Sequence, residues 1–411
     1  MRRKSTSHRQ IRTSIMDLPN DVIVEILFKI PTKSIISCRC VCKGWRVLIS
    51  NPLFVKAHSE QAKATLFLRH MNNFYLMERP EDEFGDDRCT INLDTNLKIP
   101  LCCTHVVLNN DRPKVCNLKP ENQRYKILNS CNGFICLGGH SNEPVAVCNP
   151  ITREFLTLPT PCVSERKNRK KKVFSEFSGV GFSPKHNQYK VFRTFSLLEE
   201  DLLGGFSRKG IFGEILTLEK GSSWRSVIDS ALNTTLKLCS TIEIIYSPTY
   251  IHGALHWLTS VNTIAFIDLD TEKFDFHSLP PHDSTLDGPS MTIGALESCL
   301  CVCDFPDYRC MDIWLMKEYG VSNSWTKFIS IDHIFKRGFH FGDYQALISY
   351  SSNGALLMFH SNGNALIYYH DGLLEIKPFE GPRFPSTLFR FEAVAFTPSF
   401  ISLRDVVERV S

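Results

Sequence analysis

Near the start of the chain, apolar residues recur at helical spacing. Between residues 18 and 30 they return every three or four positions, and Pro31 follows where a helix must stop. Thr32 is a suitable N-cap for a second short helix that reaches about Arg39. A third helix is expected from about Lys43 to Ile49, because Asn51-Pro52 ends the pattern. Residues 18–50 therefore predict three short helices.

This helical segment holds many large apolar side chains for its length. So short a chain buries little surface on its own. We therefore expect part of its apolar surface to be covered by a partner or by the rest of the protein.

From about Thr65 onward the period of the pattern changes to two. Short runs rich in β-branched and aromatic residues alternate with turn signals, as in the segments 125–139, 263–280 and 354–370. Alternation at this density is typical of short β-strands. The remainder of the chain is therefore predicted to be all-β.

The β region also resembles itself. The segment 145–159 (VAVCNPITREFLTLP) is similar to 263–280 (TIAFIDLDTEKFDFHSLP), and Gly-Ala-Leu opens three strands, at 253, 294 and 354. Repeats of about 40 to 50 residues with four strands each are typical of propeller blades. The spacing of these repeats is irregular, so the number of blades stays open and a β-sandwich is the structural alternative.

Composition excludes some classes of protein. Hydrophobic residues make up 43% and charged residues 22%, and the net charge is only +4, which favours a globular protein that does not bind nucleic acid. No apolar run reaches the roughly 18 to 20 residues of a membrane span, so no membrane partner is expected. Residues 1–14 are basic and unlike a secretory signal. We expect a disordered basic tail and a location in the cytoplasm and/or the nucleus.

The residues that could carry chemistry are scattered. His252 and His256 stand four apart, but a strand pattern separates them, and no zinc-type pairing of Cys or His occurs. Gly138-Gly139 lacks the Lys-Ser/Thr of a phosphate loop, and there is no Gly-x-Ser-x-Gly elbow. Alternating Cys at 299, 301 and 303 is typical of a buried strand. We therefore expect no metal, no cofactor and no catalytic residue.

Two charged runs are interpreted as loops. The basic run at 166–172 has polar neighbours, which favours an exposed loop, with a nuclear address or a contact with an acidic partner as the sharper alternatives. The acidic stretch at 81–87 is interpreted in the same way.

The N-terminal helical segment resembles the F-box, especially its plant form. The resemblance lies in LPNDVIVEILFKIP, then TKSIISCRCVCKGW, then NPLF. It implies binding to a Skp-family adaptor, in a helix-in-groove manner, through Leu18, Pro19, Val22, Ile26, Ile30, Pro31, Ile35, Cys40, Val41 and Lys43. It also implies that Trp45 closes a small helical core, which we expect to include Ile23, Leu27 and Leu48.

The β region resembles the plant F-box-associated domain, a kelch-like module. The stretch SCNGFICL, VCNPITREFLTLP and GVGFSPKHNQYKVFR carries the resemblance, without the strict double glycine of kelch repeats. The chain is thus expected to be an α+β multidomain protein with a three-helix F-box before an all-β propeller-like domain. The expected boundaries are a tail at 1–14, the F-box at 15–60, a linking segment with first strands at 61–124, the propeller-like domain at 125–400 and a C-terminal tail at 401–411.

Together these resemblances imply a non-catalytic substrate receptor of an SCF-type ubiquitin ligase. The F-box would bind the adaptor and, through it, a cullin, while loops on one face of the β domain would bind an unknown protein substrate. A ligand- or carbohydrate-binding propeller whose helices serve only packing is the alternative class. A third possibility is a protein that sequesters the adaptor without promoting degradation.

Overall fold

The structure is a computed structural model of the whole chain. It describes residues 18–62, 64–70, 73–77, 91–92, 97–99, 104–106, 108, 125–139, 144–159, 171–200, 206–227, 248–259, 263–281, 291–306, 310–332, 344–349, 356–360, 365–370, 372–380 and 392–409. The N-terminal tail 1–14, the acidic stretch 81–87 and residues 166–170 of the basic run lie outside the described residues.

The N-terminal helices number four in the described chain, one more than expected. They are α1 (Asn20–Lys29), α2 (Thr32–Cys38), α3 (Lys43–Ile49) and α4 (Pro52–Gln61). Asn51-Pro52 ends α3 as predicted, but it also starts α4, because the Asn51 side chain accepts a hydrogen bond from the Leu53 N–H at 2.9 Å. No helix in the described ranges is long and apolar enough to cross a membrane.

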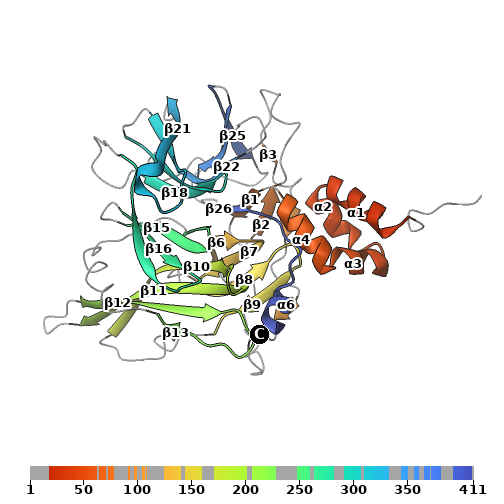
Figure 1. Cartoon of the computed structure of the whole chain (residues 1–411), viewed down its shortest axis with the longest axis horizontal. Coiled ribbons are helices and arrows are strands. Elements are labelled where there is room, and N and C mark those ends of the chain that lie inside the picture. The colour runs from red at the N-terminus through yellow and green to blue at the C-terminus, as the bar shows by residue number, and fades with distance from the viewer. Residues whose placement is uncertain are drawn as a thin grey trace, which may run out of the picture.

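The described strands form six sheets, in which most neighbouring strands are antiparallel, and the sheets are arranged as a ring (Figure 1). Blade 1 holds β26 (Glu392–Phe396), β1 (Thr65–His70), β2 (Asn73–Met77) and β4 (Leu97–Ile99). Blade 2 holds β6 (Lys126–Cys131), β7 (Phe134–Gly138), β8 (Pro144–Asn149), β9 (Glu154–Thr157) and β5 (Thr104–Val106). Blade 3 holds β10 (Lys171–Ser183), β11 (Gln188–Glu200), β12 (Phe206–Thr217) and β13 (Arg225–Ser226).

The second half of the ring repeats this plan. Blade 4 holds β14 (Thr249–Ile251), β15 (Ala254–Leu258), β16 (Thr263–Asp268) and β17 (Phe274–Ser278). Blade 5 holds β18 (Met291–Leu296), β19 (Cys299–Asp304), β20 (Cys310–Met316) and β21 (Trp325–Asp332). Blade 6 holds β22 (Tyr344–Ser349), β23 (Leu356–His360), β24 (Ala365–His370), β25 (Leu373–Glu380) and β3 (Ile91–Asn92). The fold is a six-bladed propeller, so the β-sandwich alternative is wrong.

The ring is closed by strands from opposite ends of the chain. β26 pairs antiparallel with β1, so blade 1 combines the last strand with the first ones. The expected linking segment 61–124 contributes further strands, since β5 pairs parallel with β9 of blade 2 and β3 pairs parallel with β25 of blade 6. Closure removes an open sheet edge that a β-rich chain would otherwise expose.

Neighbouring first strands of the blades are also joined by side chains. The buried Asn129 of β6 accepts a hydrogen bond from the Val180 N–H of β10 and donates one to the Val180 carbonyl, each at 2.8 Å. The Ser130 hydroxyl donates to the Ala395 carbonyl of β26. These bonds give buried polar groups their partners and hold blades 1, 2 and 3 in register.

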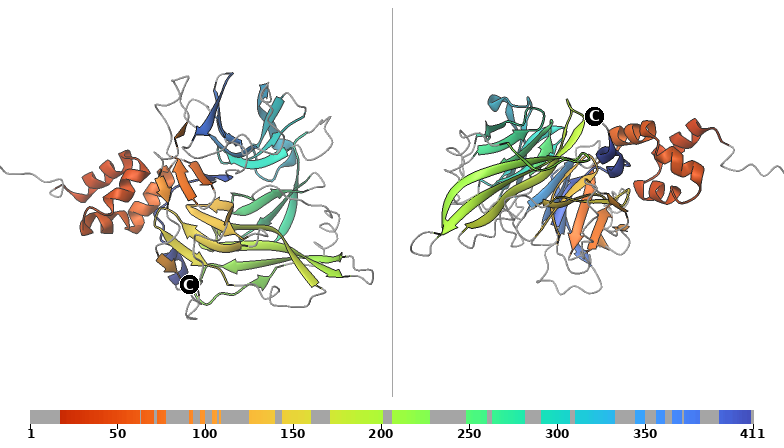
Figure 2. Two further views of the ribbon diagram at one scale, coloured as in Figure 1. Left: turned by 180° about the vertical axis from the view of Figure 1, so that it is seen from behind. Right: turned by 90° about the horizontal axis from the view of Figure 1, so that it is seen from below.

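The C-terminal residues are part of the folded core rather than a tail. We call residues 397–409 the C-terminal strap. They include α6 (Leu403–Glu408), in which Leu403, Val406 and Val407 are buried. The strap lies between α4 and blade 2, at the end of the strands that carries the β6–β7 turn (Figure 2). A sequence boundary at residue 400 therefore cuts through a continuous core.

The β6–β7 turn shows how closely the strap is packed. Asn132 and Gly133 both have positive φ, of 46° and 87°, which two-residue hairpin turns require. A Cβ at Gly133 would lie 2.3 Å from the Ser399 Cβ, whereas a Cβ at Gly221 (φ 84°) would meet nothing within 4 Å. The two glycines thus share a backbone conformation and differ in their neighbours.

We predict that Gly133→Ala destabilises the protein more than Gly221→Ala. Both changes place a side chain at positive φ, which costs more than about 0.4 to 1 kcal/mol. Only Gly133→Ala also forces the strap away, at a further cost of about 1 to 3 kcal/mol. Denaturant unfolding of the two variants measures the difference. Equal loss of stability in both would contradict the close packing of the strap.

Candidate functional site

Helix α1 presents two different flanks on either side of its buried residues. Ile23 and Leu27 are buried, as the sequence predicts for the core of the module. Val24 and Phe28 pack against the same core, and the Phe28 ring stacks on Phe54 of α4 with centroids 5.2 Å apart. Val22 on the other flank is 38% exposed. The first flank is therefore used inside the protein, while the second is left open.

The open flank continues beyond α1. Of the ten residues expected to contact an adaptor, seven are exposed in the structure: Leu18, Pro19, Val22, Pro31, Cys40, Val41 and Lys43. Ile26 and Ile30 are half-buried beside them. Val41, at the corner between α2 and α3, is 63% exposed. We call these nine residues the open helical surface.

Ile35 is the exception and corrects the expectation. Only 1% of it is exposed, and it belongs to the buried cluster together with Leu27 and Trp45. A two-turn helix such as α2 must turn one side inward to be held by packing, and Ile35 lies on that side. Ile35 therefore serves the core, and a direct surface contact for its side chain does not fit this structure.

The expected helical core is otherwise where the sequence puts it. Trp45 is buried, and Leu48 is half-buried against the same cluster. Cys42 caps α3, since its Sγ accepts a hydrogen bond from the Trp45 N–H at 3.4 Å. The Cys-Lys-x-Trp pattern thus combines a helix cap with the residue that closes the core.

Two exposed apolar residues on this module were not among those predicted. Val47 is 71% exposed and Leu53 is 79% exposed. Val47 follows Trp45 by two positions, which is about 200° around a helix, so it points away from the core. The exposure of Val47 could have been predicted from a helical wheel of α3. The exposure of Leu53 could not, because α4 was not predicted.

Helix α4 fastens this module to the propeller. His58 packs edge-on against Phe400 of the strap with ring centroids 4.9 Å apart, and Phe54 lies 6.2 Å from the same ring. The hydroxyls of Ser59 and Ser399 are 3.1 Å apart and share a hydrogen bond. One buried cluster contains residues of the helices, of blade 1, of blade 2 and of the strap. The module and the propeller therefore form one packed body (Figure 1).

Blade 2 in turn holds the strap. The Asn149 amide group donates to the carbonyls of Ser399 and Ile401, at 3.0 Å and 2.7 Å. The Glu154 carboxylate accepts from the Ser402 hydroxyl and from the Leu403 N–H, which caps α6. These contacts fix the strap at the point where it meets α4.

The Asn149 turn has a counterpart in blade 4, as the internal repeat predicts. The Asn149 Oδ1 accepts from the N–H groups of Ile151 and Thr152, and the Asp268 Oδ1 accepts in the same way from Asp270 and Thr271. Both turns end with a residue at positive φ. The shared sequence pattern therefore encodes one turn, used in two blades.

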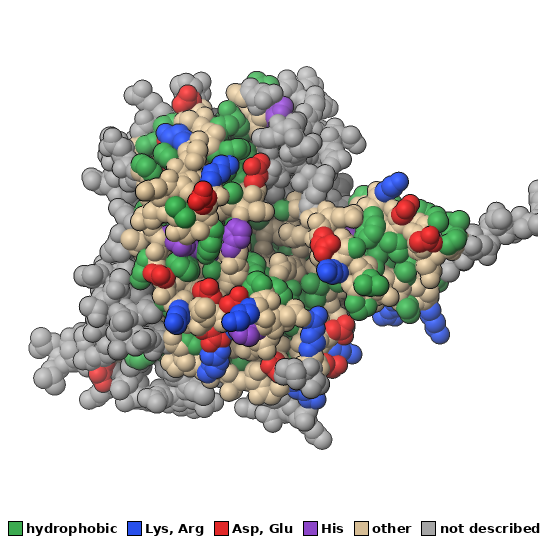
Figure 3. Space-filling view, in the orientation of Figure 1, with side chains coloured by type: hydrophobic (Ala, Val, Ile, Leu, Met, Phe, Trp, Pro, Cys, Tyr) green, Lys and Arg blue, Asp and Glu red, His purple; other side chains and the backbone are tan. Residues whose placement is uncertain are grey.

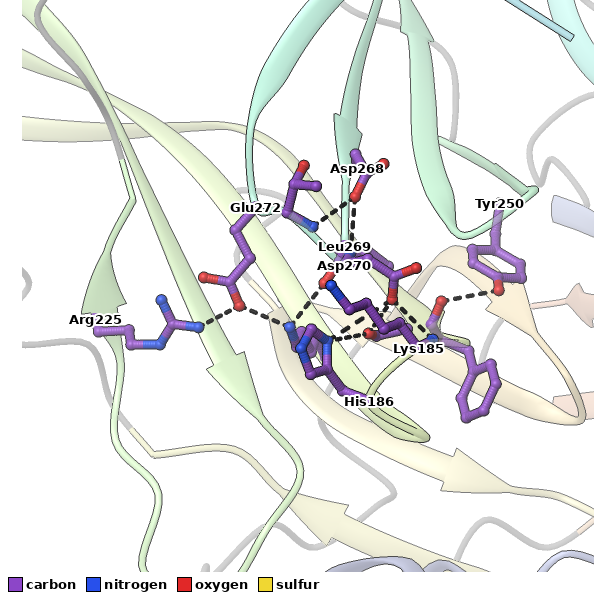
Figure 4. A network of polar contacts seen from close by, with 12 residues as sticks. Lys185, His186, Arg225, Tyr250, Asp268, Leu269, Asp270 and Glu272 are labelled. Atoms are coloured by element: carbon purple, nitrogen blue, oxygen red, sulfur yellow. Dashed lines mark hydrogen bonds and ion pairs between the residues drawn. The ribbon is translucent and has the colours of Figure 1, made fainter.

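A polar network surrounds the second of these turns and joins blades 3 and 4 (Figure 4). The buried Lys190 ammonium donates to the Leu269 carbonyl and to the Glu272 carboxylate, each at 2.7 Å. Arg225 also binds Glu272. Burial by itself would raise the pKa of Glu272, but the hydrogen bonds from Arg225 and Lys190 outweigh it and hold that pKa below its usual value. The network is an interblade link whose charges satisfy one another.

The same network contains Ser183, His186 and Asp270, the residue types of a nucleophilic triad. Their arrangement does not suit that chemistry. Ser183 is fully buried and its hydroxyl donates to Asp270, while the His186 Nδ1 lies 3.0 Å from the same hydroxyl. In a triad the serine and the aspartate contact opposite nitrogens of the histidine, whereas here the His186 Nδ1 faces both the Ser183 hydroxyl and the Asp270 Oδ1, the latter at 3.8 Å. We therefore assign these residues to the turn.

The histidines weighed as metal ligands lie around Tyr319. His252 occupies a turn at φ 49°, and its ring is tilted by 50° against that of Tyr319 with centroids 4.8 Å apart. His256 in β15 has its Nε2 2.8 Å from the Tyr319 hydroxyl. The two histidines therefore both contact Tyr319, although one lies in a turn and the other in a strand. Within the described ranges no group of three or more His, Cys, Asp or Glu residues could hold a metal ion.

Two of the three alternating cysteines of β19 are buried as predicted, and Cys299 is half-buried against the same cluster. Cys301 and Cys303 are buried, and burial raises the pKa of Cys303 to about 12. A thiol in that state is not a nucleophile at neutral pH.

His256 makes the stability of the propeller depend on pH. Burial, followed by the nearby His277, lowers the pKa of His256 to about 3, well below the value of about 6.5 in an unfolded chain. The unfolded state therefore binds more protons as the pH falls below about 6.5, and stability is lost in that direction. When the pH is lowered from about 7 to about 5, we predict that the free energy of unfolding falls by about 2 kcal/mol less in His256→Gln than in wild type.

Urea unfolding at the two pH values measures this difference. His186→Gln, in an exposed turn of blade 3, is the control. A pH dependence unchanged by His256→Gln would contradict a neutral buried His256.

Comparisons with known proteins agree with both halves of the chain. Residues 15–56 match the F-box domain, and residues 105–352 match the F-box associated beta propeller domain. The F-box protein CPR1 of Arabidopsis thaliana is 26% identical over 336 residues, covering 76% of this chain and 73% of that protein. The F-box/kelch-repeat protein At3g23880 of the same plant is 24% identical, covering 77% of this chain and 79% of that protein.

Among solved structures, YCF48 from Cyanidioschyzon merolae aligns with a TM-score of 0.38 and 11% identity, over 83% of this chain and 97% of that one. The match to the propeller family spans more than half of the chain and lies C-terminal to the F-box match. The chain therefore belongs to the family of proteins that join an F-box to an F-box associated β-propeller.

Proposed function

We propose that this protein is the substrate-recognition subunit of an SCF-type ubiquitin ligase. The open helical surface would bind a Skp-family adaptor, and the adaptor would connect it to a cullin. The single observation that carries the proposal is that one flank of α1 is used in the internal core while Val22 and Leu18, on the other side, stay 38% exposed. An apolar helical surface left uncovered by its own chain is what a helix-in-groove partner needs.

The joint between the helices and the propeller supports this role. A receptor subunit contributes no chemistry of its own, because it works by holding a target close to the charged enzyme. Its effect depends on a fixed orientation of the target-binding domain relative to the adaptor-binding module. Burial of Phe54 and Phe400 in one cluster, with the ring of the buried His58 packed against both, gives such a geometry.

The propeller would bind a protein target through loops on one face of the ring. We propose only the class of that target, which is a protein to be ubiquitylated. We place the complex in the cytoplasm and/or the nucleus. Fusing residues 160–176 to a fluorescent reporter tests a nuclear address, which a purely cytosolic signal would remove.

We predict that Val22→Asp abolishes adaptor binding while Val47→Asp preserves it. Val22 lies on the open helical surface, where a buried carboxylate without a partner would cost several kcal/mol. Val47 is more exposed, at 71%, but lies outside the set expected to touch the adaptor. Co-purification of the full chain with a Skp-family adaptor measures both.

Retention of the adaptor by Val22→Asp would overturn the proposal, provided that the variant unfolds at the same denaturant concentration as wild type. Ile35→Asp is unsuitable for this test, because Ile35 is buried and the change would unfold the module.

The same variant offers a way to find the target. Deleting the F-box would expose Phe400, which packs against Phe54 and His58 of α4 in the intact chain, so a truncated bait would be unstable. Full-length Val22→Asp keeps that core. We predict that proximity labelling in plant cells recovers a target with Val22→Asp at higher yield than with wild type, because the wild type would direct it to degradation. Equal recovery, with proteasome inhibition making no difference, would favour a binding protein without a ligase role.

A further inference from the structure

The outer edge of blade 5 is uncovered in the described part of the chain. Of the strands that end the blades, β21 and β25 are the longest described, at eight residues each. β25 is covered by β3, and the shorter β9 of blade 2 is covered by β5, whereas β21 pairs with β20 alone among the described strands. An uncovered edge strand presents backbone N–H and C=O groups with which a further strand can pair. Blade 5 therefore offers the longest such edge in the described ring.

A β-bulge decides which side chains of β21 share a face. The pairing with β20 steps from Ile329 directly to Lys327, so the residue between them is the extra residue of the bulge. The bulge shifts the alternation by one residue, and Lys327, Ser330 and Asp332 consequently lie on one face of the blade. The Lys327 ammonium and the Ser330 hydroxyl both donate to the Asp312 carboxylate, each at 2.6 Å, which agrees with this shared face.

Counted in steps of the ladder, β21 is symmetric about Ser330. Ile329 and Ile331 each lie one step from Ser330, and Lys327 and Asp332 each lie two steps from it, because the bulged residue takes up no step. In an antiparallel pair of two such strands centred on Ser330, Ile329 lies opposite Ile331 of the other copy, and Lys327 lies opposite Asp332. Opposite charges and β-branched residues are favourable cross-strand neighbours. The edge of blade 5 is thus complementary to itself.

The charged groups that this pairing needs are accessible. The Lys327 side chain is 46% exposed, and Asp332 is exposed. A lysine ammonium carries three donors, and one of those of Lys327 is bonded to Asp312. Figure 3 shows side chains of both charge signs over the visible side of blade 5, at the upper left, so no excess of one sign opposes a second copy there. Blade 5 lies away from α1, α2 and α3 (Figures 1 and 2), so the helical module leaves this edge free.

We propose that β21 is a dimerisation edge, on which a second copy of this chain pairs its own β21 in antiparallel orientation. The contact is isologous, because both copies use the same strand, so it closes after two copies and does not grow into a fibre. One strand edge is short of the roughly 1,200 to 2,000 Å² that a stable interface buries, so we expect a reversible dimer with a Kd of about 10 to 100 μM. Such a dimer presents two open helical surfaces, both away from the shared edge.

The register gives a direct test, because Ser330 lies opposite Ser330 of the other copy. Ser330→Cys brings two thiols together, since directly opposite Cα atoms of an antiparallel pair are about 4.5 to 5.5 Å apart, which a disulfide can span. Thr326→Cys is the matched control, because Thr326 is exposed on the same strand but lies three steps from the centre, so its two copies would be about 20 Å apart.

The full chain is oxidised mildly at about 100 μM, where a large part of it is expected to be dimeric, and run on a non-reducing gel. We expect at least about tenfold more disulfide-linked dimer from Ser330→Cys than from Thr326→Cys or from wild type, which reports the native cysteines. Linkage of Ser330→Cys no stronger than that of Thr326→Cys would rule out this register.

Sedimentation velocity over a range of concentrations measures the dimer without a cross-link. Asp332→Lys places like charges opposite each other twice, and we expect it to weaken the dimer at least about tenfold. A wild type that stays monomeric at about 100 μM, or a dimer that Asp332→Lys leaves unchanged, would refute the paired edge. Val22→Asp, on the open helical surface, should dimerise as wild type does, so this inference can fail while adaptor binding stands.

Discussion

The packing of Phe400 against α4 is the contact on which the rest of the arrangement depends. On one side its ring meets His58 and Phe54, and on the other its backbone neighbours are held by Asn149. Aromatic side chains bury large areas, so a few of them can carry a domain joint. Without this contact the joint would keep the hydrogen bond between Ser59 and Ser399 but would lose the aromatic packing of α4 on the strap. With it, the open helical surface has a defined direction relative to the ring.

The joint and the closure of the ring are parts of one construction. The chain enters blade 1 from α4, passes around the ring and returns to pair β26 with β1. It then runs directly into the strap, which packs on α4 and is capped by Glu154 of blade 2. The last residues of the chain therefore stabilise both the propeller and its connection to the F-box. This explains why the two parts share a buried core although they match separate family models.

Much of this fold could be predicted from residues close together in sequence. Pro31 and Asn51-Pro52 marked helix ends, alternation marked the strands, and the repeat of the Asn149 turn at Asp268 indicated blades. Helix α4 escaped because its pattern is only weakly amphipathic, and Ile35 was misassigned because a seven-residue helix gives too few positions to tell its two sides apart.

What escaped prediction depends on long-range contacts. The six blades could not be counted because β5 and β3 come from the segment before the repeats and complete blades 2 and 6. The strap brings together residues more than 100 positions apart, which no local pattern reveals. The open helical surface was found through its resemblance to a family, and the structure shows why that surface is free: the opposite flank of α1 is occupied by α4.

A joint of this kind makes the F-box and the propeller unfold as one body. Native-state hydrogen exchange of the full chain tests it most directly, by comparing amides of α4 (Pro52–Gln61) with those of β1 and β26. We expect the most protected amides of all three elements to open with the same free energy, and to lose protection together when Phe400 is replaced by Ala. Opening of α4 at a much lower free energy, with β1 and β26 still fully protected, would contradict the account.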